Sequence, residues 1–318
     1  MAHPMPPVVR IVRDDGLGED NPTFLVDGLR WALAYGGLEG FDGITHTVSA
    51  QDYAQYDGSY LLSERSPSKD RTITMVSYLP RAEAKAEAES FFIPGRPYEV
   101  HVSWEGRERW CAGRQYALSC EVAPNGAAQK VTWTVLCLDP YLLSEDEKSF
   151  DVAEASGSRG FPFCSFASRV APAPEAEEGG AGAAGPVEAH VAGFVVGSLS
   201  KRVRLVNAGH ATAYPRFDVT ATGEVERPVI SVYDRAGSVV GTVGLDLTMK
   251  DGDELVIDFS SRPTTLELNG ANVSHLVTRG STLATGIEVG EFEIGWSARS
   301  GDAALHVTPS IRERYASI

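Results

Sequence analysis

The stretch VTWTVLCLDPYLLSEDE, residues 131–147, brings a cysteine and an aspartate close together and so could form a reactive thiol site. The alternation before the cysteine instead predicts a strand, one face of which carries Val131, Trp133, Val135 and Cys137. Cys137 is then a packed thiol, which behaves as a small hydrophobe. Asp139 precedes Pro140, which cannot donate to a strand ladder, so the strand must stop or reach an edge there.

Three apolar residues follow the proline, Tyr141, Leu142 and Leu143, before an acidic run begins. An apolar cluster just outside a strand needs something to cover it. We therefore predict that these three residues form an oligomer or partner interface, at the point where a first domain ends. A neighbouring element of the same chain is the alternative cover, and in that case the cluster is internal core.

No other stretch has the spacing of a catalytic or metal site. The Gly-x-Ser-x-Gly of serine hydrolases is absent, and Ser158 in SGSRG, its nearest approach, is expected to be a loop serine. The four cysteines include no CxxC pair and are expected to be free thiols, with a Cys111–Cys120 disulfide left open. Histidines stand singly, at positions 3, 46, 101, 190, 210, 275 and 306. We therefore predict no catalytic residue, no metal site and no cofactor.

Weaker patterns point to ordinary structure. GSVVGTVG, residues 237–244, lacks the GxGxxG spacing of a phosphate loop and predicts a strand that tolerates glycines. Asp251 and Asp253 lie in KDGDE, which is typical of a solvated hairpin turn. Of the five tryptophans, four lie in strand-like alternation, where an aromatic ring is usually core. Trp296 is the candidate glycan contact, because indole rings can stack on sugars.

Composition limits the classes of partner. The chain has 318 residues, enough for two domains, and a formal net charge of -15. A surface that negative repels phosphates and anionic lipid, so specific nucleic-acid binding is not expected. No apolar run of about 18 residues is present, which argues against membrane insertion. The start, MAHPMPPVVRIVRDDG, lacks the apolar stretch of a signal peptide, so we expect synthesis in a cytoplasm.

The first half, residues 1–150, reads as a β domain with one short helix. RPYEVHVSW and RWCAG alternate around the turn EGRE and predict a hairpin, and RTITMVSY predicts another strand. LPRAEAKAEAESFFIPG predicts a helix between Pro80 and Pro94. Its one apolar face, which would lie on a sheet, consists of Ala84, Ala88, Phe91 and Phe92.

A change of composition separates the two halves. Residues 151–195 form a connecting segment whose stretch 171–189, rich in Ala, Glu and Gly, has no periodicity. Eight short strands separated by turn signals follow in residues 196–318, and they imply a β-sandwich or jelly roll. The predicted fold is mainly β, with an N-terminal β-barrel-like domain and a C-terminal sandwich.

The order of these motifs resembles that of the distal tail proteins of long-tailed (siphovirus-type) bacteriophages and prophages. The resemblance rests on TFLVDGLRW, QYDGSYLLSERSPSKDRTITMVSYLP, the helix, the hairpin strands and VTWTVLCLDPYLL. In the second half it rests on VNAGHATAYPRFDVTATG, KDGDELVIDF and LELNG, which look like the galectin-like sandwich of that family. The pair of sugar-binding stretches of true galectins is missing, since Trp296 is followed by Ser297, Ala298 and Arg299.

The resemblance implies a non-enzymatic structural subunit of the virion tail tip, assembled in the host cytoplasm. Its N-terminal domains would form a homo-oligomeric ring, typically a hexamer, that joins the tail tube to the host-recognition hub. The implied partners are the major tail-tube protein, the tail-tip hub protein and the tape-measure protein, with DNA passing through the ring. The alternative is a carbohydrate-binding module that recognises host cell-wall saccharide.

Overall fold

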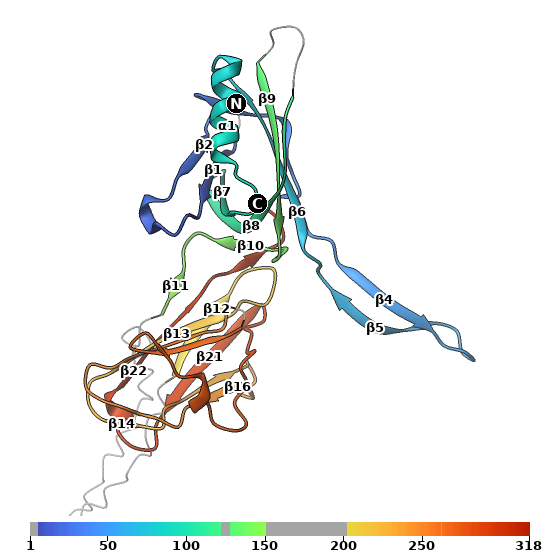
Figure 1. Ribbon diagram of the computed structural model, residues 1–318. Helices are drawn as coiled ribbons and strands as arrows, with labels where there is room; N and C mark the ends of the chain where they lie inside the picture. Colours follow the sequence, from blue (N-terminus) through green and yellow to red (C-terminus); the bar gives the residue numbers. More distant parts are fainter. Residues whose placement is uncertain (1–5, 122–127, 151–201, 262) are drawn as a thin grey trace, which may run out of the picture.

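The computed structural model describes residues 6–121, 128–150, 202–261 and 263–318, and within these ranges the chain is mainly β with one α-helix (Figure 1). The mainly β prediction is therefore confirmed. The predicted connecting segment 151–195, with Ser158 and Cys164, lies outside the described residues. None of the described helices is long and apolar enough to cross a membrane.

The N-terminal half forms one antiparallel sheet in the order β2-β1-β7-β8-β9-β6-β3. Its strands are β1 Val8–Arg13, β2 Thr23–Val26, β3 Trp31–Glu39, β6 Lys69–Ser77, β7 Pro97–Trp104, β8 Arg107–Cys120 and β9 Gln129–Cys137. The predicted hairpin is β7–β8, whose two-residue turn uses positive φ at Glu105 and Gly106. No described pairing joins the end strands β2 and β3, so the sheet is open and does not close into the expected barrel.

Helix α1, Arg81–Phe91, lies against the N-terminal sheet, close to the predicted range. All four residues of the predicted apolar face are buried: Ala84, Ala88 and Phe91 in the helix and Phe92 directly after it. Phe92 packs on the ring of Trp133, with centroids 4.9 Å apart. The β9 face predicted from alternation is also buried, because its side chains meet this helix across the core.

The C-terminal half is a two-sheet sandwich around its own core. One sheet has the order β11-β22-β13-β18-β19-β20 and the other β12-β21-β15-β16. The bounds are β11 Lys148–Ser149, β12 Arg202–Asn207, β13 Pro215–Ala221, β15 Val229–Tyr233, β16 Val239–Gly244, β18 Glu254–Asp258, β19 Thr265–Leu268, β20 Ala271–Asn272, β21 Gly290–Ser297 and β22 Leu305–Ile311. The eight predicted strands are all present, and the sandwich prediction is confirmed, although its galectin-like character stays a prediction.

Smaller elements complete the description. A two-stranded ribbon pairs β14 Val225–Glu226 with β17 Thr248–Met249. Three 3₁₀ turns are η1 Gly18–Asp20, η2 Ser274–Leu276 and η3 Asp302–Ala304. A second hairpin, β4 Thr47–Asp52 with β5 Ser59–Arg65, extends away from both halves (Figure 1).

The two halves exchange short strands. β10, Leu142–Ser144, pairs with β8 and also with β23, Arg314–Tyr315, so residues near the end of the chain join the N-terminal sheet. In return β11, which follows β10, pairs with β22 of the sandwich. The amide of Ile318 donates to the carbonyl of Phe41, deep in the N-terminal half. The halves are therefore joined by two crossing segments of chain.

Candidate functional site

The β4–β5 hairpin, here called the arm, has no core of its own. Every residue of both strands is exposed. Its apolar side chains nevertheless include Val48, Leu61 and Leu62, which are 58%, 58% and 54% exposed, and Tyr56, which is 78% exposed. The arm was not predicted as an element, although Asp57-Gly58 between two alternating stretches is a hairpin signal. An isolated hairpin is marginal in water, so the arm needs a surface to lie on.

The predicted interface residues Tyr141, Leu142 and Leu143 lie at the joint between the two halves. Leu142 is 0% exposed and belongs to the N-terminal core, where it lies opposite Tyr315 of β23. Its cover is therefore an element of the same chain, which was the alternative left open by the sequence. Tyr141 and Leu143 are half-buried, and only these two stay candidates for contact with another subunit.

Trp296, the candidate glycan contact, does not lie on a binding surface. It is 7% exposed, lies in β21 and belongs to the core of the sandwich. A sugar cannot stack on a ring that is packed between two sheets. The structure thus corrects this prediction, and strand alternation gives the reason: Phe292, Ile294 and Trp296 all point to the same buried face.

The described cysteines are free thiols, as predicted: Cys111 and Cys137 are buried and Cys120 is partly exposed. The Cys111–Cys120 disulfide is not formed. The hydrogen bond between Cys111 and Cys137, together with burial, raises the pKa of Cys111 well above its ordinary value, and the same hydrogen bond lowers the pKa of Cys137. Because the thiolate is the reactive form of cysteine, a neutral buried thiol indicates packing and not chemistry.

A buried carboxylate, Glu313, organises the joint. It is 2% exposed and accepts hydrogen bonds from Lys148 Nζ at 2.6 Å, from the Ala208 amide at 2.9 Å and from the Tyr315 hydroxyl. Burial by itself would raise the pKa of Glu313, but these hydrogen bonds outweigh it and hold the pKa below its ordinary value. Burial and the Glu313 carboxylate in turn raise the pKa of Tyr315 to about 12.

Arginines complete the joint. Arg314, which is 8% exposed, pairs with Asp139 and stacks over the ring of Tyr141 at 4.4 Å. Arg109 stacks over Tyr315 at 3.7 Å and donates to the Ser317 carbonyl. Asp139 therefore has a structural role: it is the counter-ion that ties the end of β9 to the returning strand.

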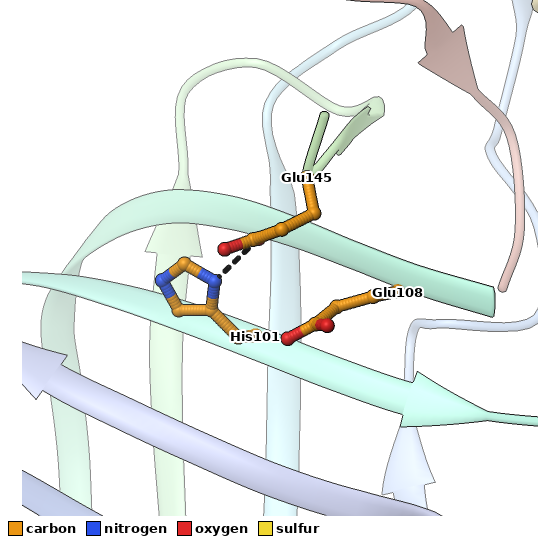
Figure 2. Close-up of side chains that lie close together, drawn as sticks. All are labelled: His101, Glu108 and Glu145. Atoms are coloured by element: carbon orange, nitrogen blue, oxygen red, sulfur yellow. Dashed lines mark hydrogen bonds and ion pairs between the residues drawn. The ribbon is translucent and has the colours of Figure 1, made fainter. Parts of the chain in front are cut away.

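A cluster of His101, Glu108 and Glu145 lies at the same joint (Figure 2). His101 is in β7, Glu108 is in β8, and Glu145 directly follows β10. The imidazole Nδ1 lies 2.7 Å from Glu145 Oε2, although the two residues are 44 positions apart in the sequence. Sequence spacing therefore gave no signal of this cluster, and His101 was placed among the single histidines.

Comparisons with known proteins agree on one architecture. No known family model and no curated protein matches the sequence. The solved structure of the Dit protein of phage SPP1, described as a hub of the adsorption apparatus in phages that infect Gram-positive bacteria, matches with a TM-score of 0.61 and 11% identity. The match covers 96% of this chain and 98% of that protein. The chain has the fold of a phage distal tail protein.

The baseplate of phage P2 gives the same result. Its activated conformation with Ca matches with a TM-score of 0.54 and 9% identity over 99% of this chain and 100% of that chain. The conformation with Sr matches with a TM-score of 0.53 and 8% identity over 98% and 100%. The distal tail fold thus extends over both halves of the chain, and identity this low shows the fold alone.

Proposed function

We propose that this protein is a structural, non-enzymatic subunit of a phage tail tip, where it forms a ring that joins the tail tube to the host-recognition hub. The distal tail fold, which covers nearly the whole chain, supports the class of protein. The ring is supported by the arm, whose apolar side chains Val48, Leu61 and Leu62 are more than half exposed in the described part of the chain. A second copy of the chain is the partner that fits.

The position of the arm favours a ring over a two-fold dimer. The arm extends on one side of the N-terminal half, whereas β2 lies on the opposite side (Figure 1). Around β2 the surface exposes further apolar side chains, with Leu25 48% and Leu29 79% exposed. Contact between two different surfaces of identical subunits is heterologous, and such contacts close into a ring when the rotation between subunits allows it.

The ring is proposed to be a homohexamer in the virion tail tip. Its proposed neighbours are the major tail-tube protein on one side and the tail-tip hub protein on the other, with the tape-measure protein and later DNA passing through the centre. The net charge of -15 supports passage of DNA without adhesion, because like charges form none of the contacts that release counterions from a duplex. The glycan-binding alternative loses its candidate residue with the burial of Trp296.

Negative-stain microscopy and light scattering test the proposal on the purified chain. We expect rings for the native protein and folded monomers for the double variant Leu61→Ser/Leu62→Ser. Ser63→Ala, on the same exposed strand, is the matched control and should keep the ring. A native protein that stays strictly monomeric at tens of micromolar contradicts the ring, and rings that survive the double variant contradict the role of the arm.

A further inference from the structure

The side chains of His101, Glu108 and Glu145 bring their nitrogen and oxygen atoms together, as the ligands of a bound cation do. Each residue offers one ligand atom, and the three atoms lie within 4.8 Å of one another (Figure 2). The sheet register explains part of this arrangement: Glu108 stands opposite Ser103, so it is the diagonal neighbour of His101 on the same face. Glu145 reaches them from the connector between β10 and β11.

A cation of the chain already lies where the three groups converge. Arg10 Nη2 is 3.1 Å from His101 Nδ1, 3.2 Å from Glu145 Oε1 and 4.0 Å from Glu108 Oε1. The Arg10 side chain is 40% exposed, so its guanidinium can move into water without being buried elsewhere. The position of the Arg10 guanidinium therefore shows that the cluster accommodates a positive charge, and this guanidinium can be displaced by another cation.

Glu99 adds a second observation on the other side of the imidazole. The side chain of His101 is only 9% exposed, and its Nε2 is buried. Glu99 Oε2 lies 3.5 Å from that nitrogen. Histidines that bind metals usually direct their second ring nitrogen to a carboxylate, which leaves the first nitrogen unprotonated for the metal.

The balance of charge favours a divalent ion. Three carboxylates, Glu99, Glu108 and Glu145, surround the imidazole, and Arg10 is the guanidinium that pairs with two of them. The Arg312 guanidinium, which donates to the Glu145 carbonyl, has Glu147 as its own counter-ion. A single positive charge leaves an excess of negative charge beside a buried ring, and an ion with two charges offsets more of it. One imidazole nitrogen with two carboxylate oxygens is a ligand set that suits zinc and similar metals.

We propose that His101 Nδ1, Glu108 and Glu145 bind a divalent metal ion of the zinc class, which displaces Arg10, with Glu99 orienting the imidazole. The ion would fasten the connector that carries Glu145 to strands β7 and β8, at the joint between the two halves. The proposal is independent of ring formation, because all four residues belong to one chain.

The test is a titration of the full-length, tag-free chain with Co²⁺, a spectroscopic substitute for zinc. Trp110 stacks on His101 with ring centroids 5.8 Å apart, so bound cobalt should quench its fluorescence. We expect saturable binding of one ion per chain, lost in Glu108→Gln, whose side chain is 46% exposed. Glu99→Gln should weaken binding about tenfold, as expected for a group that orients a metal ligand.

The Arg10→Ala variant distinguishes a metal site from a cluster that is only structural. Removal of the competing cation should tighten cobalt binding, whereas a structural ion pair would only lose stability. The arm supplies a matched control, because His46 and Glu64 form a similar pair at 3.5 Å on an exposed surface, and His46→Ala should leave binding unchanged. No saturable quenching, binding that persists in Glu108→Gln, or binding that does not tighten in Arg10→Ala overturns the proposal.

Discussion

The pentapeptide Tyr-Leu-Leu-Ser-Glu occurs twice in this chain, with opposite results. In the arm it spans residues 60–64, and both of its leucines are more than half exposed. At the joint it spans residues 141–145, and its first leucine, Leu142, is 0% exposed. Each copy even pairs its glutamate with a histidine, at 3.5 Å on the arm and at 2.7 Å at the joint. Identical local sequences thus form a surface without a partner in one place and a packed core in the other.

The difference lies in what the chain brings to each copy. The copy at the joint is covered by β23 and faces β8, so the cover comes from residues more than 170 positions away. Among the described strands, the arm copy pairs with β4 alone, another exposed strand. Apolar side chains that the chain itself covers stabilise the monomer, and those that it leaves uncovered are available to a second copy.

The largest expected effect comes from the two equivalent leucines. Leu142→Ala should lower the free energy of unfolding by about 2–5 kcal/mol, because it leaves a cavity in the N-terminal core. Leu61→Ala in the arm should change it by no more than about 0.5 kcal/mol, since that side chain is exposed in the monomer. Urea denaturation of the monomers measures both values. Equal losses of unfolding free energy would contradict the conclusion that Leu142 is core and Leu61 is surface.

Glu313→Gln should have the next largest effect, about 1–3 kcal/mol at pH 7, because it weakens a buried network of hydrogen bonds. The folded-state pKa of Glu313 is lowered, so its contribution is present above the unfolded pKa and is lost as the pH falls through the folded value. Urea midpoints between pH 7 and pH 3 should therefore fall less steeply in the variant. An unchanged slope would contradict the lowered pKa.

Tyr315→Phe tests the contribution of the same hydrogen-bond network to stability at alkaline pH. The pKa of Tyr315 is raised to about 12, so its contribution is fully present below the unfolded value near 10 and is lost as the pH approaches 12. The native protein should lose more stability than the variant across this interval, as followed by circular dichroism. Tyr60→Phe in the arm, where the side chain is 38% exposed, is the matched control for the loss of a tyrosine hydroxyl.

The smallest effect is expected for the exposed pair of the arm. Glu64→Gln removes the partner of His46, but both side chains are about half exposed or more, and exposed ion pairs contribute only about 0–1 kcal/mol. Thermal unfolding of the monomer should be unchanged within error. A loss comparable to that of Glu313→Gln would show that the arm is packed within its own chain.

Much of the fold could be predicted because its signals are local. The period-two pattern of β7 and β9, the Pro-bounded helix α1 and the turn residues between the sandwich strands each depend on a few neighbouring residues. The stop at Pro140 follows from the missing amide of proline. The partner of Asp139, by contrast, is Arg314, and no pattern near residue 139 indicates an arginine 175 positions later.

The candidate sites show the same division. Leu142 was recognised as an apolar residue that needs a cover, but the cover itself depended on the return of β23. His101 looked solitary because its partners come from β8 and from the connector after β10. Trp296 looked available because its side chain could be read as aromatic surface, and only the second sheet of the sandwich buries it.

The sequence by itself determined the helix, the turns and many of the strands, though not those of the arm, because backbone preference and side-chain alternation act over a few residues. It also determined that Tyr141, Leu142 and Leu143 need a cover, since apolar surface is costly in water. Only the tertiary structure decided which copy is buried in the chain and which stays exposed. That choice depends on contacts between distant segments, which local sequence does not encode.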